Sequence, residues 1–266
     1  MKKVQSADGT TIAFDQLGKG PAIILVDGAL GQRAMDSEAT QLAPLLAEHF
    51  TVLSYDRRGR GDSTDTQPYA VEREIEDIDT LINEVGGSAF LFGISSGAAL
   101  AMEAAIKLGG KVKKLAMYEA PYNDDKDARQ AWKAYRKQLT EVLAQGRKGD
   151  ALALFMLLVG MPPDHLDSVR QHPMWPMWEA VAPTLAYDAA AMGEDASVPT
   201  EKVARVTVPT LVMDGGASYP FMHVTALALV KAMPHAKHRT LEGQTHEVDP
   251  QVLAPVLEEF FNSNAD

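Results

Sequence analysis

The sequence contains no cysteine among its 266 residues. This absence excludes disulfides, thiolate nucleophiles and metal sites that depend on cysteine ligands. A long apolar run is also missing, because no stretch approaches the roughly 20 residues that a helix needs to cross a bilayer. The N-terminal MKKVQSADGT carries two lysines but no apolar segment after them, so we expect no signal peptide and a cytoplasmic protein.

Positive charge is scarce as well. The chain has 25 lysines and arginines against 36 aspartates and glutamates, which gives a formal net charge of −11. Nucleic acids and anionic membranes are bound through basic patches, so neither is an expected partner. The length and the hydrophobic share of 46% fit one large α/β domain, or such a domain with an insertion.

Apolar runs alternate with helical patterns in the first half of the chain and again near its end. Expected strands lie at 21–28, 51–56, 88–94, 112–119, 208–216 and 236–243, with helical spacing between them. Strands that are apolar at nearly every position and are separated by helices are typical of a parallel sheet covered on both faces. We therefore expect an α/β fold.

Residues 122–203 contain helical patterns but no convincing strand. We expect them to form a helical cap inserted into a core made of residues 1–121 and 204–266. The HPMWPMW segment has two prolines, which predicts a cavity-lining loop and makes Trp175 and Trp178 candidate contacts for an apolar or aromatic substrate. The alternative for each tryptophan is packing of the cap onto the sheet. An apolar cap could also pair with a second copy, which leaves a homodimer open.

The sequence FGISSGA places Ser95 in a Gly-x-Ser-x-Gly motif between an expected strand and an expected helix. A serine on such a turn has a strained backbone, and the flanking Gly93 and Gly97 permit close packing. The hydroxyl would stand at the carboxyl end of the sheet, where the backbone N–H of Ser96 could stabilise an oxyanion. We therefore predict that Ser95 is a nucleophile. The alternative is a turn of small residues without chemistry.

A serine nucleophile needs a base, and His246 is the best placed of the seven histidines. It lies in LEGQTHEVDP, after the last expected strand and before the last helix. The carboxyl ends of parallel strands meet at one edge of a sheet, so we expect His246 at the same edge as Ser95.

The loop DGALGQ follows the first of the parallel strands and could supply a second N–H to an oxyanion. Gly28 and Ala29 are the candidate donors. Asp27 either belongs to an ordinary Asp-Gly turn or makes a contact that holds this loop at the substrate. We favour the second interpretation and count Asp27 among the substrate-binding candidates.

Taken together, these motifs resemble the α/β-hydrolase superfamily over essentially the whole chain. YDRRGRGDS is similar to the turn after the fourth strand of that superfamily and VPTLVMDGG to its seventh strand, and the order of Ser95 before His246 agrees as well. The resemblance implies a mostly parallel eight-stranded sheet with helices on both faces and a helical cap insertion. It also implies a serine hydrolase that needs no cofactor.

The acid is where the chain departs from the superfamily pattern. Most members have an aspartate a few residues past the glycine of the seventh strand, and that place falls on Ser218, whose neutral hydroxyl cannot offset the charge of an imidazolium. Three carboxylates could replace it: Asp214 in or at the end of the strand, Asp249 shortly after the histidine, and Glu119 at the end of the neighbouring strand.

We favour Glu119, which resembles the glutamate that serves as the acid after the sixth strand in zearalenone-type lactone hydrolases. DGALG, GISSGA, YEAP and GGASYP are similar to the oxyanion loop, elbow, acid position and following turn of that family. The resemblance covers most of the core and is loose in the insertion, which sets substrate choice. It implies an ester or lactone as substrate, and the methionines and tryptophans of the insertion suit an apolar or aromatic one.

Two other classes of function stay open. The same site could carry out a cofactor-free reaction other than hydrolysis, such as perhydrolysis, elimination or cleavage of a carbon–carbon bond. The chain could also be a non-catalytic receptor for a small molecule, which the neutral Ser218 favours. A metal site is not expected, because no His-x-x-x-His motif or carboxylate cluster lies at the expected loops.

Overall fold

Eight strands form one sheet in the computed structural model, which describes residues 1–35 and 37–263. The strands are β1 (Lys2–Gln5), β2 (Thr11–Leu17), β3 (Ala22–Val26), β4 (Thr51–Tyr55), β5 (Ala89–Ile94), β6 (Val112–Tyr118), β7 (Thr210–Gly215) and β8 (Ala236–Leu241). They lie in the order β1-β2-β4-β3-β5-β6-β7-β8. β2 pairs antiparallel with β1 and β4, whereas the other pairs are parallel, which confirms the predicted sheet.

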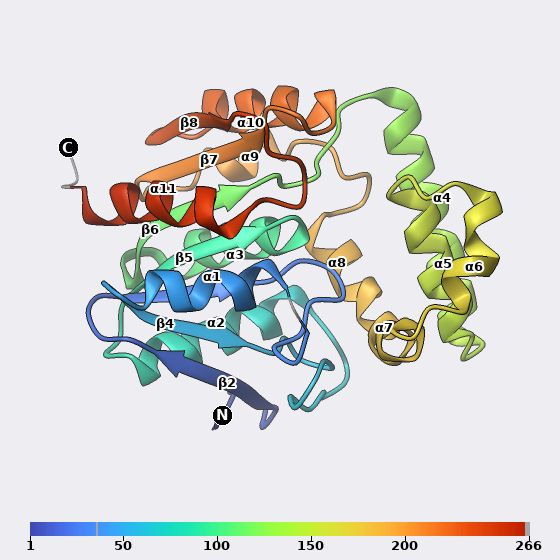
Figure 1. The fold of residues 1–266 in the computed structure, drawn as a ribbon, viewed down its shortest axis with the longest axis horizontal. Helices are drawn as coiled ribbons and strands as arrows, with labels where there is room; N and C mark the ends of the chain where they lie inside the picture. The colour runs from blue at the N-terminus through green and yellow to red at the C-terminus, as the bar shows by residue number, and fades with distance from the viewer. Residues whose placement is uncertain (36, 264–266) are drawn as a thin grey trace.

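Helices cover both faces of this sheet (Figure 1). They are α1 (Glu38–Leu46), α2 (Val71–Glu84), α3 (Ser96–Leu108), α10 (Pro220–Ala232) and α11 (Pro250–Asn262). One apolar core joins α2, α3 and α10 to the sheet, and a second core joins α1 and α11 to its other face. All five residues of β3 are buried, as expected for a strand with helices on both sides.

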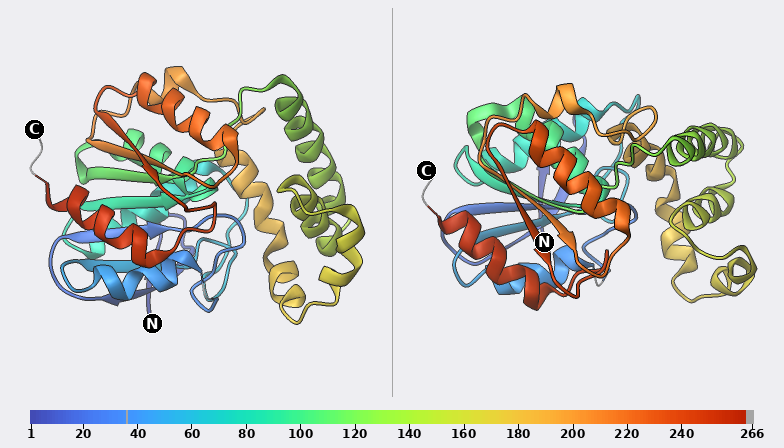
Figure 2. Two further views of the ribbon diagram at one scale, coloured as in Figure 1. Left: turned by 45° about the horizontal axis from the view of Figure 1, so that its top comes forward. Right: turned by 90° about the horizontal axis from the view of Figure 1, so that it is seen from above.

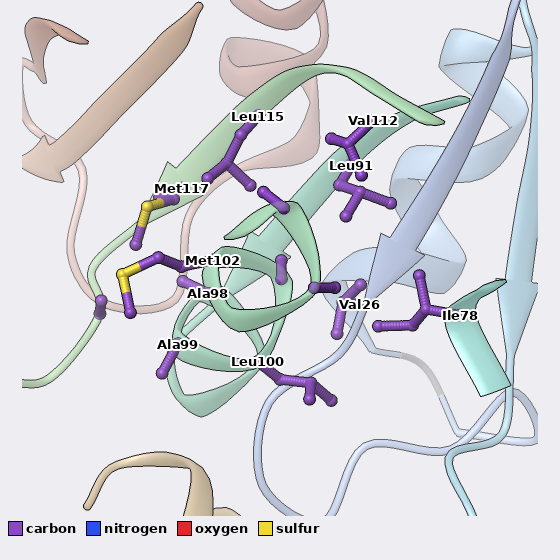
Figure 3. Packing of buried hydrophobic residues seen from close by; sticks show 14 of the residues in the cluster. Val26, Ile78, Leu91, Ala98, Ala99, Leu100, Met102, Val112, Leu115 and Met117 are labelled. Atoms are coloured by element: carbon purple, nitrogen blue, oxygen red, sulfur yellow. The ribbon is translucent and has the colours of Figure 1, made fainter. Parts of the chain in front are cut away.

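Helix α3 lies over the middle of the sheet. Its buried positions include a run of alanines, among them Ala98 and Ala99, whose small side chains allow the helix to approach the strands closely. Val26, Leu91 and Met117, from β3, β5 and β6, pack in the same core as this helix (Figure 3). This packing fixes the start of α3 at the carboxyl ends of these parallel strands.

The chain between β6 and β7 forms helices, with no strand among its described residues. These are α4 (Lys126–Ala144), α5 (Lys148–Leu158), α6 (Leu166–Arg170), α7 (Trp175–Val181), α8 (Leu185–Ala191) and α9 (Thr200–Val203). Helices α4–α7 stand beyond one edge of the core (Figures 1 and 2) and share an apolar cluster. Helix α8 contributes Leu185 and Ala189 to this cluster and also packs on α2 and α3. In the part of the chain that the structure describes, none of the helices has the length and apolar character to cross a membrane.

The segment HPMWPMW differs from its prediction. We expected a loop, but α7 begins at Trp175 and continues through the second tryptophan. Pro176 is compatible with this helix because it lies in the first turn, where a backbone N–H has no partner within the helix. Two prolines within four residues were therefore a poor signal for a loop here.

Candidate active site

Ser95 occupies a strained turn between β5 and α3. Its φ of 55° and ψ of −130° lie outside the regions that residues with a side chain normally adopt. The backbone N–H of Ser95 donates to the carbonyl of Tyr118 at 2.9 Å, which ties the turn to the neighbouring strand β6. A strained backbone persists only where the surrounding structure over-determines it, and such positions cluster at functional sites.

The two glycines of the motif stand where a side chain would collide with neighbouring backbone atoms. A Cβ at Gly97 would lie 2.2 Å from the carbonyl oxygen of Val26, and a Cβ at Gly93 would lie 2.5 Å from the carbonyl oxygen of Gly97. Both distances are far inside van der Waals contact, and both neighbours are backbone atoms that cannot rotate away. The close contact of the turn with β3 therefore depends on the missing side chains.

Replacing Gly97 with alanine is expected to lower the free energy of unfolding by about 1–3 kcal/mol, because the new methyl group must push the turn away from β3. Urea denaturation measures this loss. The matched control is Gly110→Ala, since a Cβ there meets no heavy atom within 4 Å. Equal stability of the two variants would contradict the steric explanation.

His246 links Ser95 to Glu119. Its Nε2 lies 3.2 Å from Ser95 Oγ, and its Nδ1 lies 2.6 Å from Glu119 Oε2. The loop that carries His246 is tied to the end of β6, because the Tyr118 hydroxyl donates to the carbonyl of Thr245. The His246 side chain is about one-third exposed, whereas that of Glu119 is fully buried. The structure thus brings together the three residues that the sequence suggested as nucleophile, base and acid.

Glu119 is held by three contacts. Beside His246, the backbone N–H of Gly215 donates to its Oε1 at 2.8 Å, and the Ser218 hydroxyl donates to its Oε2 at 2.9 Å. The residue has a φ of 46°, a conformation uncommon for a glutamate. Ser218, at the place where an aspartate was expected, therefore contacts the glutamate that we predict to replace it. The sequence pattern marked this position but gave no sign of that contact.

The two alternative acids lie elsewhere. Asp249 accepts a hydrogen bond from the backbone N–H of Gln251 at 2.8 Å and caps the start of α11. Asp214 contacts His223 and His238. Neither forms a hydrogen bond or ion pair with His246 among the described residues, so Glu119 is the carboxylate placed to orient the imidazole.

The predicted oxyanion loop after β3 lies directly against Ser95. A Cβ at Gly28 would be 3.0 Å from Ser95 Cβ, and the neighbouring Ala29 packs against the apolar cluster of α4–α7. The carboxyl group of Asp27 is buried against Gly31 of the same loop. Asp27 is therefore placed to shape the loop, while a contact with substrate stays a prediction.

Ser96 stands at the first position of α3, where the helix leaves its backbone N–H without a partner within the helix. This N–H and those of the Gly28–Ala29 loop come from the two segments that flank the Ser95 hydroxyl. Their roles as oxyanion donors stay a prediction, and the helix dipole at the same end favours negative charge there.

A buried ionic network holds the backbone of the Asp27–Gly28 loop, and no sequence pattern indicated it. Arg60 Nη1 donates to the carbonyl of Gly28 at 2.6 Å, and Arg57 Nη1 to the carbonyl of Asp27 at 3.3 Å. Both guanidiniums also pair with Asp188 of α8, at 2.7 and 2.6 Å. The Ser96 hydroxyl donates to the same carboxylate at 2.8 Å.

Asp188 therefore joins α8 to both halves of the predicted oxyanion site. Burial would raise the pKa of Asp188, but the charges of Arg60 and Arg57 and the Ser96 hydroxyl hold it below its ordinary value of 3.8. Because the folded pKa is depressed, this carboxylate contributes stability at pH values above 3.8, and the contribution is lost as the pH falls through the folded pKa.

Replacing Asp188 with asparagine is expected to lower the free energy of unfolding by about 3–5 kcal/mol, because Arg57 and Arg60 lose a buried counter-charge. Thermal or urea denaturation at neutral pH checks this value. Asp150→Asn is the matched control in the same helical segment, because its partially exposed pairs with Arg147 and Arg170 are worth about 1 kcal/mol or less. Comparable losses in the two variants would argue against the network.

The two tryptophans pack within the helical segment. Trp175 is buried in the cluster of α4–α7 and lies under the guanidinium of Arg170 at 5.5 Å. Trp178 is partly buried against the same cluster and stacks on His172 with ring centres 5.3 Å apart. These contacts give both residues a packing function, and their contact with substrate stays a prediction.

Comparison with known proteins agrees with this fold. Residues 27–256 match the family model described as the alpha/beta hydrolase family. The crystal structure of an alpha/beta hydrolase from Sphaerobacter thermophilus DSM 20745 is 50% identical, covers 98% of this chain and 100% of its own, and has a TM-score of 0.87. An enol-lactonase from Burkholderia xenovorans LB400 shares the fold at 19% identity, with 98% and 100% coverage and a TM-score of 0.68.

Among curated proteins, a proline iminopeptidase from Pestalotiopsis fici is 31% identical over 113 residues. The match covers 41% of this chain and 40% of that protein, so it spans well under half of the relative. The family model, by contrast, extends from the loop after β3 into the last helix and includes Ser95, Glu119 and His246. The chain belongs to the alpha/beta hydrolase family.

Proposed function

We propose that this protein is a serine hydrolase that cleaves a carboxylic ester or lactone through an acyl-enzyme. The observation that carries the proposal is the continuous contact from Ser95 Oγ through His246 to Glu119, with distances of 3.2 and 2.6 Å. A nucleophile, a base within hydrogen-bond reach and a third group that orients the base are the parts that acyl transfer requires.

In the proposed reaction, His246 Nε2 accepts the hydroxyl proton as Ser95 Oγ bonds to the substrate carbonyl carbon. The carbonyl oxygen becomes an oxyanion, which the N–H groups of Ser96 and of Gly28 or Ala29 stabilise. Loss of one such donor typically costs about 3–4 kcal/mol of transition-state stabilisation. The C–O bond then breaks, and the alkoxide leaves with the proton from His246.

Water completes the cycle. His246 accepts a proton from the water as its oxygen attacks the acyl-enzyme, and the proton passes to Ser95 when the acid product departs. Glu119 keeps the imidazole oriented and offsets its positive charge in both halves of the reaction. These steps need no cofactor.

We further propose that α4–α8 form the cap of this hydrolase and select apolar or aromatic substrates. Leu30, next to the candidate oxyanion donors, is buried in the apolar cluster of α4–α7, so the helical segment reaches the edge of the site. The resemblance of the core motifs to zearalenone-type lactone hydrolases supports a lactone. The fold shared with the enol-lactonase is consistent with that choice.

A substrate panel tests the proposal. It contains zearalenone, small lactones, aryl esters of rising acyl length and a proline arylamide, with products identified by mass spectrometry. A fluorophosphonate probe is applied in parallel, and the labelled residue is mapped by peptide sequencing. Turnover of a lactone or ester with the label on Ser95 is the expected result. Turnover of the arylamide alone would indicate a peptidase, and the absence of both labelling and turnover would favour a receptor.

A further inference from the structure

Asp214, His223 and His238 form a compact cluster where β7, β8 and α10 meet. Asp214 lies near the end of β7, His238 on the adjacent strand β8, and His223 in the first turn of α10, which packs on both strands. One ligand atom from each residue lies within 4.8 Å of the others. The spacing along the chain, nine and then fifteen residues, fits no short metal motif, which is why sequence reasoning missed it.

Each imidazole contacts a different oxygen of the same carboxylate. His223 Nδ1 lies 3.0 Å from Asp214 Oδ2, and His238 Nε2 contacts Asp214 Oδ1. Thr240 Oγ1 donates to the carboxylate at 3.3 Å. The three groups thus converge on one point, and two of them are fixed by the pairing of neighbouring strands.

The partners of the Asp214 carboxylate are two imidazoles and a hydroxyl, an environment that is compatible with a bound cation. The carboxylate is buried, and within the described ranges 1–35 and 37–263 no lysine or arginine forms an ion pair with it. Buried carboxylates are paired or coordinate metals, and an ion held by the same two imidazoles would add positive charge next to this carboxylate. His223 is half exposed and His238 one-fifth exposed, so an ion from solvent can reach the cluster.

The geometry suits a tetrahedral transition metal. Zinc binds imidazole nitrogen at about 2.0–2.1 Å, so two imidazoles on one tetrahedral ion have ring centres roughly 5 Å apart. The ring centres of His223 and His238 are 5.3 Å apart, and their planes meet at 70°. Two nitrogens and one oxygen are borderline ligands, which favours zinc, cobalt or nickel over calcium or magnesium, whose sites are built from oxygens.

We propose that Asp214, His223 and His238 bind a divalent transition-metal ion, with zinc as the best fit. Three protein ligands leave a fourth position for solvent. The ion would join β7, β8 and α10 at the outer part of the sheet. The neighbouring residue Gly215 donates its N–H to Glu119, so the bound ion also stiffens the strand that supports the acid.

The test starts from full-length protein dialysed against a chelator. Zinc is titrated by calorimetry and by thermal unfolding, and cobalt by its visible absorption, which reports tetrahedral coordination. We expect binding of one ion per chain and a rise in Tm of roughly 5 °C or more at zinc concentrations about 100-fold above Kd. The His223→Ala and His238→Ala variants are expected to lose affinity by at least about 100-fold.

His235→Ala is the matched control, because this exposed histidine lies near the same edge outside the cluster. It should bind zinc like the wild-type protein. His223→Gln provides a second variant at the most exposed ligand, and circular dichroism verifies that each variant is folded. The proposal is overturned if zinc leaves the Tm of the wild-type protein unchanged, or if folded ligand variants bind zinc as tightly as the wild type.

Discussion

Replacing Ser95 with alanine is expected to lower kcat for the best substrate of the panel by about 10⁵–10⁶-fold. The variant removes the oxygen that His246 contacts, and with it the covalent route. In serine hydrolases, loss of the nucleophile costs about as much as loss of the whole nucleophile–base–acid unit, because the three groups act together. What remains is the contribution of the oxyanion donors and of binding, about 10³–10⁴-fold over the uncatalysed reaction. Single-turnover kinetics with quantified product measures this residual rate.

Ser96→Ala provides the matched control, because the two serines are adjacent and chemically identical. The hydroxyl of Ser96 bonds to Asp188, away from His246, and alanine keeps the backbone N–H. We expect kcat to change by less than about tenfold, since the loss is that of one hydrogen bond within the supporting network. A larger loss of kcat in the Ser96 variant than in the Ser95 variant would show that Ser96, and not Ser95, is the nucleophile.

Much of the fold could be predicted because its strongest signals are local. Buried parallel strands such as β3 are apolar at every position, and helices between them repeat at a different period. The antiparallel strand β1 has no such signal, because it is short and mostly exposed. The helix α7 was missed for another reason: proline disfavours a helix interior but is accepted in the first turn, and a sequence pattern does not show where a helix begins.

The candidate site divides in the same way. Ser95 and His246 could be proposed from the sequence because each follows a recognisable strand, and parallel strands bring such positions to one edge. The contacts that hold these two residues and the neighbouring loop could not be predicted from the sequence. Arg60 and Asp188 are 128 residues apart, and only the return of α8 to the core brings them together. Ser218 was noticed only as a missing aspartate, because a hydroxyl that bonds to a distant glutamate has no sequence pattern.

Replacing Glu119 with glutamine is expected to lower kcat by about 10⁴-fold with little change in KM. The amide keeps the size of the side chain but removes the negative charge that orients and offsets the imidazolium. Since this charge matters only as the transition state forms, the effect belongs in kcat and leaves substrate binding nearly unchanged. Asp249→Asn is the control for the competing assignment. Asparagine is also a good helix N-cap, so this variant should retain both stability and rate.

The contact of Ser218 with Glu119 allows a sharper test, in which the acid is moved. Ser218 Oγ lies 2.9 Å from Glu119 Oε2, the oxygen that contacts His246 Nδ1, so a carboxylate at position 218 would start close to the same imidazole nitrogen. We expect the double variant Glu119→Gln, Ser218→Asp to regain at least about tenfold of the kcat lost in Glu119→Gln, because a charge is restored beside His246. The single variant Ser218→Asp should be slower than the wild type, since the new carboxylate would lie beside the buried Glu119 and the two negative charges would repel each other. If the double variant were no faster than Glu119→Gln, the carboxylate at 119 would have to act through its position directly after β6 as well as through its charge.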